Sequence, residues 1–284
     1  MKKQVAVVTG TSSGVGLALS EALAQSGWKV YATMRNLDRG EAVRDLQDKG
    51  LDIECLQLDV QLQESVDHAI AAIMKREETI DLLVNNAGIG YIRTTEQATE
   101  EAYKNVFDIN VFGVIRCTKA VLPHMRERKQ GRVVTISSIG GLVGQPFNEI
   151  YCATKFAVEG YFESLATYVT PEFGIEFMIV EPAGISSAFA NHVMKQVSES
   201  GGFYKDEYEP LLNAYLGSRE HFPPEIMQTS EQVAEVVVKQ LSAHPLPLRM
   251  RTSAWAEDFC RYKTASDPTG LIQTKEVQQL MLRK

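Results

Sequence analysis

A tyrosine and a lysine stand four residues apart at Tyr151 and Lys155, within a segment whose pattern is typical of a helix. That spacing puts both side chains on one face of a helix, one turn apart. An ammonium group beside a phenol stabilises the phenolate and lowers a pKa that is normally about 10. The tyrosine could then act as an acid or a base near neutral pH. Both residues are common on amphipathic helices, so the spacing alone fits an ordinary surface helix as well.

A glycine-rich turn, residues 9–16 with the sequence TGTSSGVG, lies between the first expected strand and the first expected helix. Gly10 allows the tight turn, Gly14 lets the backbone approach a pyrophosphate, and Gly16 allows close packing of helix on strand. The helix then presents free N–H groups and the positive end of its dipole to phosphates. The spacing GxxxGxG differs from the GxGxxG dinucleotide fingerprint, and an ordinary Gly/Ser loop is the alternative. The strand–turn–helix context favours a nucleotide site.

Arg35 follows the second expected strand, at the position where dinucleotide enzymes distinguish their two cofactors. An Asp or Glu there accepts hydrogen bonds from the ribose 2′-hydroxyl of NAD, whereas an Arg accommodates the 2′-phosphate of NADP. Residues 33–36 contain no carboxylate, and Asp38 is better suited to the N-cap of the next helix. A guanidinium matches a phosphate in charge and geometry, so the sequence favours NADP(H) over NAD(H). A solvated surface charge is the alternative for Arg35.

Short apolar runs alternate with longer segments of helical period through the first two thirds of the chain. Strands are expected at residues 5–9, 29–34, 52–58, 81–85, 132–137 and 175–181. Helices are expected at residues 15–25, 38–48, 65–76, 99–128 with a break near 108–110, and 151–168. Strict βαβ alternation predicts an α/β fold over residues 1–284: a single-domain, Rossmann-type, doubly wound parallel sheet with helices on both faces.

The regular pattern loosens after Pro182. Residues 183–229 form an irregular stretch after the carboxyl end of a strand, which favours a substrate lid over a disordered insert. Four aromatic residues in it could line an apolar pocket or pack the lid itself: Phe189, Phe203, Tyr204 and Phe222. A helix over residues 230–241 follows, with Ser230 as its expected N-cap. Residues 245–284 form a C-terminal extension.

Composition excludes several classes of protein. The 284 residues are 44% hydrophobic and 23% charged, with a net charge of −7. These values argue against a disordered chain and against a general nucleic-acid binder, which needs a basic face. Four scattered cysteines suit a reducing, cytoplasmic environment, and the five histidines show no metal-ligand spacing. No apolar run is long enough for a signal peptide or a membrane span.

Five motifs at coherent spacing resemble the short-chain dehydrogenase/reductase family over residues 4–185. In chain order they are the TGxxxGxG cofactor turn at residues 9–16, an adenine-binding Leu58-Asp59-Val60, the NNAG motif at residues 85–88, a catalytic Asn110, and Ser138 thirteen residues before Tyr151. Residues 29–35 and 146–157 look most similar to the 17β-hydroxysteroid and retinol dehydrogenases. Members of that subgroup that carry this Arg typically prefer NADP(H), in agreement with the charge of Arg35.

The resemblance implies hydride transfer between a nicotinamide and a carbonyl or secondary alcohol. The implied catalytic residues are Asn110, Ser138, Tyr151 and Lys155. The implied cofactor-binding residues are Gly10, Ser12, Ser13, Gly14, Val15, Gly16, Arg35, Asp59, Val60, Asn86, Ala87, Gly88, Tyr151, Lys155, Pro182, Gly184 and Ile185. Tyr151 would give a proton to the forming alkoxide, and Ser138 would hold the carbonyl oxygen. Lys155 would lower the pKa of Tyr151 and bind the nicotinamide ribose, and Asn110 would hold a water that links Lys155 to solvent.

The sequence departs from the family pattern after the sixth expected strand. The family's Pro-Gly appears as Pro182-Ala183-Gly184, and Ser186 or Ser187 replaces the usual threonine near the carboxamide. The small residues of the 151–168 helix suit close helix packing, and this helix often forms a subunit interface in the family. A homodimer or homotetramer is therefore expected.

A hydrophobic ketone or alcohol, steroid-like or retinoid-like, is the expected substrate. A 3-oxoacyl-thioester reductase or a general carbonyl reductase of the same family is the first alternative. A non-catalytic dinucleotide-sensing protein is the second, although such proteins usually lack the Tyr or the Lys that this chain keeps. A nucleotide-binding methyltransferase would explain neither the NNAG motif nor the Ser-Tyr-Lys spacing.

Overall fold

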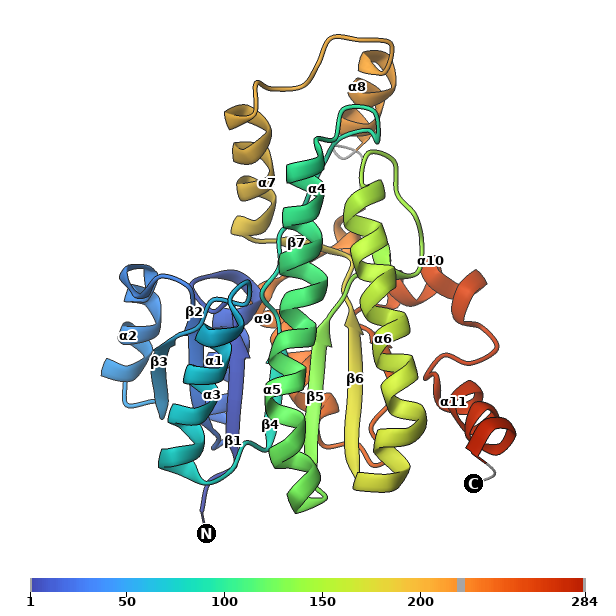
Figure 1. Cartoon of the computed structure of the whole chain (residues 1–284). Helices are drawn as coiled ribbons and strands as arrows, with labels where there is room; N and C mark the ends of the chain where they lie inside the picture. Colours follow the sequence, from blue (N-terminus) through green and yellow to red (C-terminus); the bar gives the residue numbers. More distant parts are fainter. Residues whose placement is uncertain (1, 219–222, 283–284) are drawn as a thin grey trace.

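The computed structural model describes residues 2–218 and 223–282 (Figure 1). Seven parallel strands form the central sheet in the order β3-β2-β1-β4-β5-β6-β9. Their bounds are β1 Val5–Thr9, β2 Lys29–Met34, β3 Ile53–Gln57, β4 Leu82–Asn85, β5 Gly131–Ile136, β6 Ile175–Glu181 and β9 Arg249–Arg251. The strand order reverses between β1 and β4, the point at which doubly wound sheets bind their ligands. The predicted Rossmann-type α/β fold is confirmed.

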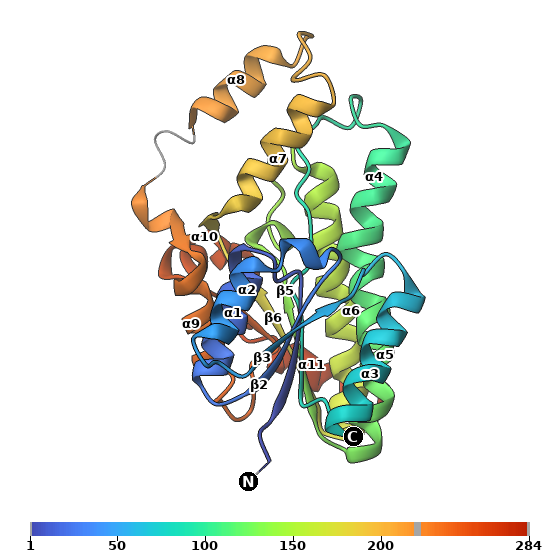
Figure 2. The same ribbon diagram turned by 90° about the vertical axis from the view of Figure 1, so that its left-hand side faces the viewer.

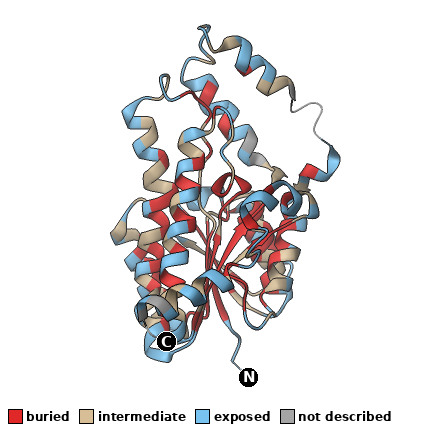
Figure 3. Ribbon diagram, turned by 90° about the vertical axis from the view of Figure 1, so that its right-hand side faces the viewer, coloured by how far each residue is buried: buried red, intermediate tan, exposed pale blue. Residues whose placement is uncertain are grey.

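Helices cover both faces of the sheet (Figure 2). One face carries α1 (Gly14–Gln25), α2 (Glu41–Asp48) and α9 (Ser230–Gln240), and the other carries α3 (Gln63–Glu77), α5 (Gly113–Arg128) and α6 (Glu149–Phe173). Leu19 and Val233 pack in the core of the first face, and Val66, Val121 and Phe162 pack in the core of the second. Figure 3 shows the buried residues gathered along the strands and the inner faces of these helices. Burial of these apolar stripes holds the layers together.

The expected helix over residues 99–128 contains a π-helical turn in place of a break. It consists of α4 (Glu100–Phe107) and α5, joined through Asp108–Phe112. Such turns insert one extra residue per helical turn and are frequent at functional sites. This one carries Asn110, whose side chain is 1% exposed.

Two expected N-caps are wrong. Asn36, and not Asp38, caps the short 3-10 turn before α2, because its side chain accepts a 2.9 Å hydrogen bond from the Asp38 N–H. Thr229, and not Ser230, caps α9 in a capping box with Gln232. The helix α2 itself begins after Gly40, which has no side chain to cap it, so Asp38 stands two residues before that N-cap. The helix α9 begins at Ser230, so its capping oxygen comes from the residue just outside it, Thr229.

Residues 183–229 are largely helical, and the expectation of an irregular stretch is wrong. They form β7 (Gly184–Ser186), α7 (Ala188–Glu199), α8 (Glu209–Ser218) and β8 (Met227–Thr229). Residues 219–222, which include Phe222, lie outside the described residues. Because β7 pairs with β8, the two ends of the segment are tied together. In Figure 1, α7 and α8 stand beyond the carboxyl ends of the sheet strands.

The C-terminal extension completes the sheet edge. After β9 it forms α10 (Ala254–Thr264) and α11 (Leu271–Val277). Arg249, Met250 and Arg251 pair with the last three residues of β6. Of the helices that the structure describes, none has the length and apolar character needed to cross a membrane.

Candidate active site

The glycine-rich turn lies between β1 and α1 at the switch point of the sheet. Gly10 has a φ of +69°, and a Cβ there would lie 2.8 Å from the Cα of Ala87. A Cβ on Gly16 would lie 2.4 Å from the Gly10 carbonyl oxygen and from Nδ2 of Asn86. Gly14 begins α1 with a φ of +62°, and a Cβ there would meet nothing closer than 3.7 Å. Gly10 and Gly16 thus allow close backbone packing, while Gly14 leaves room for a ligand.

Hydrogen bonds tie the NNAG loop to this turn. Asn86 Nδ2 donates to the carbonyls of Thr9 at 2.8 Å and of Gly10 at 3.0 Å. The Thr9 hydroxyl accepts from the backbone N–H groups of Asn86 and Ala87, both at 3.0 Å. Ser13 is the N-cap of α1, yet its side chain makes no capping hydrogen bond. The first-turn N–H groups of α1 are therefore left for an anion, as at other phosphate-binding helix ends.

Exposed cations mark the end of β2. Arg35 is exposed, and its side chain makes no hydrogen bond or ion pair within residues 2–218 and 223–282. Arg39 is exposed as well, one 3-10 turn further on. Sequence reasoning missed Arg39, although its spacing of four residues from Arg35 was a signal for it. The glycine turn, the open helix end and these cations together fit the phosphates of a dinucleotide.

The expected adenine-binding segment lies at the carboxyl end of β3. Asp59 is half-buried, and its Oδ1 accepts a 3.0 Å hydrogen bond from the Gln61 N–H. Val60 is buried against Gly113, where a Cβ would lie 2.9 Å from the Val60 side chain. Ser12 and Val15 lie within the turn and the start of α1. The structure therefore brings Asp59 to the same edge of the sheet as the glycine turn.

Ser138, Tyr151 and Lys155 converge where β5 ends and α6 begins. Gly140 lies between the first two, since a Cβ there would be 3.4 Å from Oγ of Ser138 and 3.5 Å from the Tyr151 ring. The hydroxyl groups of Ser138 and Tyr151 lie close enough to interact, since the Ser138 hydroxyl lowers the pKa of Tyr151. Lys155 Nζ lies 5.7 Å from the centroid of the Tyr151 ring and donates a 2.8 Å hydrogen bond to the Ile136 carbonyl. The i, i+4 spacing on α6 thus produces the predicted juxtaposition.

Asn110 joins the loop after β4 to α6. Its Oδ1 accepts from the Ile89 N–H at 2.8 Å, and its Nδ2 donates to the Ile89 carbonyl at 2.8 Å and to the Thr154 hydroxyl at 3.1 Å. Gly88 lies between Asn110 and Lys155, because a Cβ there would be 3.2 Å from Asn110 Oδ1 and 3.8 Å from Lys155 Nζ. All four expected catalytic side chains therefore meet at one place.

Burial sets the charge states of this group. Burial raises the pKa of Tyr151 to about 12, and the Ser138 hydroxyl only partly lowers it. Burial lowers the pKa of Lys155 to about 8, while Glu159 raises it in part. Burial of both groups opposes the expected lowering of the pKa of Tyr151 by Lys155, which stays a prediction. Tyr151 therefore carries its proton at neutral pH.

The segment after β6 runs back to the glycine turn. The carbonyl of buried Pro182 accepts a 3.0 Å hydrogen bond from the Ile139 N–H, beside Ser138. The next strand, β7, consists of Gly184, Ile185 and Ser186. Ser187 is the N-cap of α7, and its Cβ lies 3.7 Å from where a Cβ on Gly14 would stand. Of the two serines left open by the sequence, Ser187 is the one that lies against the turn.

Apolar side chains of α7 and α8 border the catalytic group. The ring centroids of Phe189 and Tyr151 are 6.2 Å apart. Behind them lies the lid cluster, made of buried Ile92, Phe147, Val193 and Leu212 with partly buried Phe203, Tyr208, Tyr215 and Leu216. Phe203 and Tyr204 also flank Arg93, whose guanidinium lies 5.6 and 5.3 Å from their ring centroids. Aromatic residues of residues 183–229 thus both line the site and pack the lid.

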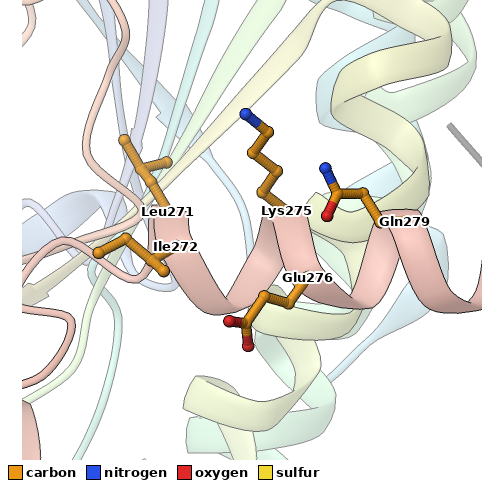
Figure 4. A pocket seen from close by; sticks show the side chains of 5 residues that line it. All are labelled: Leu271, Ile272, Lys275, Glu276 and Gln279. Atoms are coloured by element: carbon orange, nitrogen blue, oxygen red, sulfur yellow. The ribbon is translucent and has the colours of Figure 1, made fainter.

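A separate surface hollow runs along α11 (Figure 4). Its lining consists of Leu271, Ile272, Lys275, Glu276 and Gln279. In Figure 1, α11 lies far from α7 and α8, and none of these five residues is among the predicted site residues. Across the described parts of the chain, no group of three or more His, Cys, Asp or Glu side chains could hold a metal ion.

Comparison with known proteins identifies the family. Residues 4–198 match the model of the short chain dehydrogenases. The chain is 37% identical to retinol dehydrogenase 8 of Bos taurus, over 98% of this chain and 90% of that protein. It is 38% identical to human 17-beta-hydroxysteroid dehydrogenase type 1, over 95% of this chain and 83% of that protein. The crystal structure of a short-chain dehydrogenase from Streptomyces avermitilis superimposes with a TM-score of 0.78 at 32% identity, covering 99% of both chains.

The chain belongs to the short-chain dehydrogenase/reductase family. It is an oxidoreductase of the kind that acts on CH–OH groups, and the family binds a nicotinamide dinucleotide. The resemblance inferred from the five sequence motifs is confirmed.

Proposed function

We propose that the chain transfers hydride between NADP(H) and a hydrophobic ketone or secondary alcohol, steroid-like or retinoid-like. The observation that carries the proposal is the meeting of Ser138, Tyr151 and Lys155 beside the apolar ring of Phe189. The polar groups of Ser138, Tyr151 and Lys155 would supply acid–base chemistry. The ring of Phe189 would supply an apolar surface for a hydrophobic substrate.

A bound nicotinamide dinucleotide supplies the hydride. In the direction of reduction, protonated Tyr151 gives its proton to the carbonyl oxygen that becomes the alcohol. The Ser138 hydroxyl donates a hydrogen bond to the same oxygen and stabilises its developing negative charge. Lys155, held by the Ile136 carbonyl, stabilises the phenolate left on Tyr151 and offers donors to the nicotinamide ribose. Asn110 holds the loop after β4 against α6 and so helps to position Tyr151 and Lys155.

The phosphates of the cofactor would be held by the glycine turn. Backbone N–H groups of residues 12–16 would donate hydrogen bonds to the phosphates, and Asn86 and Ala87 support the turn through their hydrogen bonds with Thr9. Arg35 would bind the 2′-phosphate of NADP, with Arg39 as a second cation at the same end of β2. Their exposure and lack of carboxylate partners among the described residues support NADP(H) over NAD(H).

Residues 183–229 would serve as the substrate lid of a single domain. Their helices stand beyond the carboxyl ends of the strands, where α/β sheets bind ligands. The apolar lid cluster supports a bulky hydrophobic substrate over a 3-oxoacyl thioester, whose phosphorylated carrier would need a basic entrance. Two relatives, retinol dehydrogenase 8 and 17-beta-hydroxysteroid dehydrogenase type 1, are named after hydrophobic substrates. Their names support a hydrophobic substrate for this chain as well.

The test is a screen of NADPH oxidation against steroid, retinoid, aliphatic and acyl-thioester carbonyls. We expect the highest kcat/KM with a steroid or retinoid carbonyl. A preference for acyl thioesters would contradict the proposed substrate class but would still agree with the proposed hydride transfer. Failure of every carbonyl, together with tight NADPH binding, would favour a dinucleotide-sensing protein.

We also propose a homodimer or homotetramer in the cytoplasm. The outer side of α6 exposes Phe156 and Tyr168, and Phe112 is exposed before α5. These rings would be covered by a second copy of the chain. Four cysteines without a disulfide suit a reducing compartment. Light scattering of the purified protein would measure the number of copies, and a monomer at micromolar concentration would contradict the proposal.

A further inference from the structure

Two carboxyl groups lie side by side in the interior behind Lys155. Glu159 follows Lys155 by one turn of α6, and Glu181 is the last residue of β6. The two side chains are 4% and 0% exposed, and they are close enough to form a hydrogen bond with each other. Within the described residues, both oxygens of Glu159, Oε1 of Glu181 and the neighbouring Ser137 hydroxyl make no hydrogen bond of ordinary geometry. Two carboxylates cannot satisfy one another, because both only accept hydrogen bonds.

Charged groups surround this pair on three elements. The facing groups are Lys155 and Glu163 from α6, Arg249 and Arg251 from β9, and Glu257 and Cys260 from α10. Glu181 accepts a 3.0 Å hydrogen bond from Arg251, and Arg251 also pairs with Glu257 at 2.8 Å. Arg249 pairs with Glu163 and lies 3.9 Å from Glu181. Glu159 has no such ion pair among the described residues.

A shared proton would remove an unpaired buried charge from this pair. Arg249 and Arg251 lie against Glu181 and are shared with the half-exposed Glu163 and Glu257, and neither forms an ion pair with Glu159, so full ionisation would leave Glu159 as a buried anion without an ion pair among the residues that the structure describes. A buried anion without a partner is costly, because water solvates an ion far better than a protein interior does. One proton removes that charge and turns one carboxyl into the donor that the orphaned oxygens lack.

We propose that Glu159 carries this proton and uses it to donate a hydrogen bond to the carboxylate of Glu181. Lys155 then lies beside a neutral acid and not beside an anion. The proton belongs on Glu159 because Arg251 touches only Glu181 and stabilises its negative charge. Glu159 is then a neutral neighbour of Lys155 and takes no direct part in the reaction.

The direction of the pKa shifts agrees with this assignment. Burial and the adjacent charge of Glu181 raise the pKa of Glu159 well above its ordinary range. Burial raises the pKa of Glu181 to about 7, while Arg251 lowers it in part. A neutral Glu159 leaves only burial acting on Lys155, which lowers the pKa of the ammonium group, whereas an ionised Glu159 raises that pKa in part. The kinetic consequence rests on the proposed function, but the shared proton does not.

Infrared spectroscopy of the whole protein tests the proton directly. We expect the carbonyl stretch of a buried protonated carboxylic acid at pH 7, and we expect it to disappear in Glu159→Gln. The control is Glu163→Gln, one turn further along α6, which removes an ionised and half-exposed carboxylate. The band should persist in that variant. Absence of the band from the wild-type spectrum, or its persistence in Glu159→Gln, would overturn the proposal without any assay of activity.

Thermal unfolding provides the second readout. A raised pKa means that the folded chain keeps a proton which the unfolded chain releases above about pH 4.3, so wild-type stability falls as pH rises from 5 towards the folded pKa. Glu159→Gln lacks this loss, so its Tm relative to wild type should climb by about 4 °C between pH 5 and pH 9. Glu163→Gln should show a constant offset. A constant offset in Glu159→Gln as well would mean that Glu159 is merely structural.

Kinetics then separates a neutral from an ionised Glu159. Glutamine mimics the neutral acid, so kcat/KM of Glu159→Gln at pH 7 should stay within about twofold of wild type. If Glu159 were instead an ionised partner of Lys155, its removal would lower both the activity at pH 7 and the alkaline kinetic pKa. Inactivity of the wild-type protein with every carbonyl would contradict the proposed function, while the infrared and unfolding results would still decide the shared proton.

Discussion

The ring of Phe189, in the first turn of α7, lies 6.2 Å from the ring of Tyr151, and the two ring planes are inclined by 59°. Phe189 reaches this position by packing on Gly90, where a Cβ would stand only 2.9 Å from the phenyl ring. Residues 183–229, which depart from the βαβ alternation, thus place an apolar ring beside Tyr151. A hydrophobic substrate between lid and cofactor would touch both rings.

Phe189→Ala should weaken the binding of hydrophobic substrates. The ring is 42% exposed, so a substrate can bury its remaining surface, and its loss should raise KM by about fivefold, the equivalent of about 1 kcal/mol. The Kd for NADPH should not change. Phe259→Ala is the matched control, because Phe259 is 39% exposed on α10 and lies outside the proposed site. An equal rise of KM in both variants would remove Phe189 from the substrate site.

Arg93→Met should loosen the lid. The guanidinium is 5% exposed and donates to the Ser200 hydroxyl at 2.7 Å and to the Gly202 carbonyl at 2.9 Å. Methionine keeps the apolar contacts but leaves these acceptors unpaired, at a cost of about 2 kcal/mol. Hydrogen exchange should accelerate in α7 while the sheet stays protected. Ser200→Ala removes one of these bonds and should give a smaller change; unchanged exchange in Arg93→Met would show that the lid is held elsewhere.

Gly16→Ala should weaken cofactor binding. The added Cβ would lie 2.4 Å from the Gly10 carbonyl and from Asn86, so the turn must move. We expect the Kd for NADPH to rise by about tenfold or more. Gly160→Ala is the contrasting substitution, since a Cβ there meets nothing within 4 Å on a regular helix. It should raise stability by about 0.5–1 kcal/mol and leave the Kd unchanged. Equal Kd values for NADPH in the two variants would contradict the proposed binding of the cofactor at the glycine-rich turn.

Arg35→Asp should move the cofactor preference from NADPH towards NADH. The carboxylate repels a 2′-phosphate and accepts hydrogen bonds from a ribose 2′-hydroxyl, so the ratio of kcat/KM values should change by at least about tenfold. Lys49→Asp, which makes the same change of charge on an exposed residue at the end of α2, is the control. An unchanged ratio in Arg35→Asp would mean that Arg35 is only a surface charge.

Sequence periodicity located most of the sheet because its strands are short, buried and rich in β-branched residues. The expected strands at residues 5–9, 29–34 and 175–181 coincide with β1, β2 and β6. The site followed from the same pattern, since motifs at the carboxyl ends of parallel strands must meet at one edge. The capping box at Thr229 and Gln232 was also visible in the sequence, where the T-x-x-Q pattern outweighs the nearer Ser230.

Tertiary contacts explain what the sequence could not supply. Residues 183–229 contain several Gly and Pro and many polar residues, and contacts with Arg93 and the lid cluster hold the helices α7 and α8 in place. The pKa of Tyr151 depends on burial by distant segments, which the local spacing with Lys155 does not encode. The pairing of Glu159 with Glu181 needs β6 and α6 to pack side by side, which no spacing in the chain encodes.

The central claim is that Tyr151 is the acid–base group of a hydride-transfer enzyme, and Tyr151→Phe tests it most directly. Phenylalanine keeps the ring and removes only the hydroxyl beside Ser138. The decisive measurement is kcat for reduction of the best carbonyl found in the screen, with the Kd for NADPH measured on the same sample. The account predicts a loss of more than about 10²-fold in kcat with an unchanged Kd. Turnover close to wild type would contradict it.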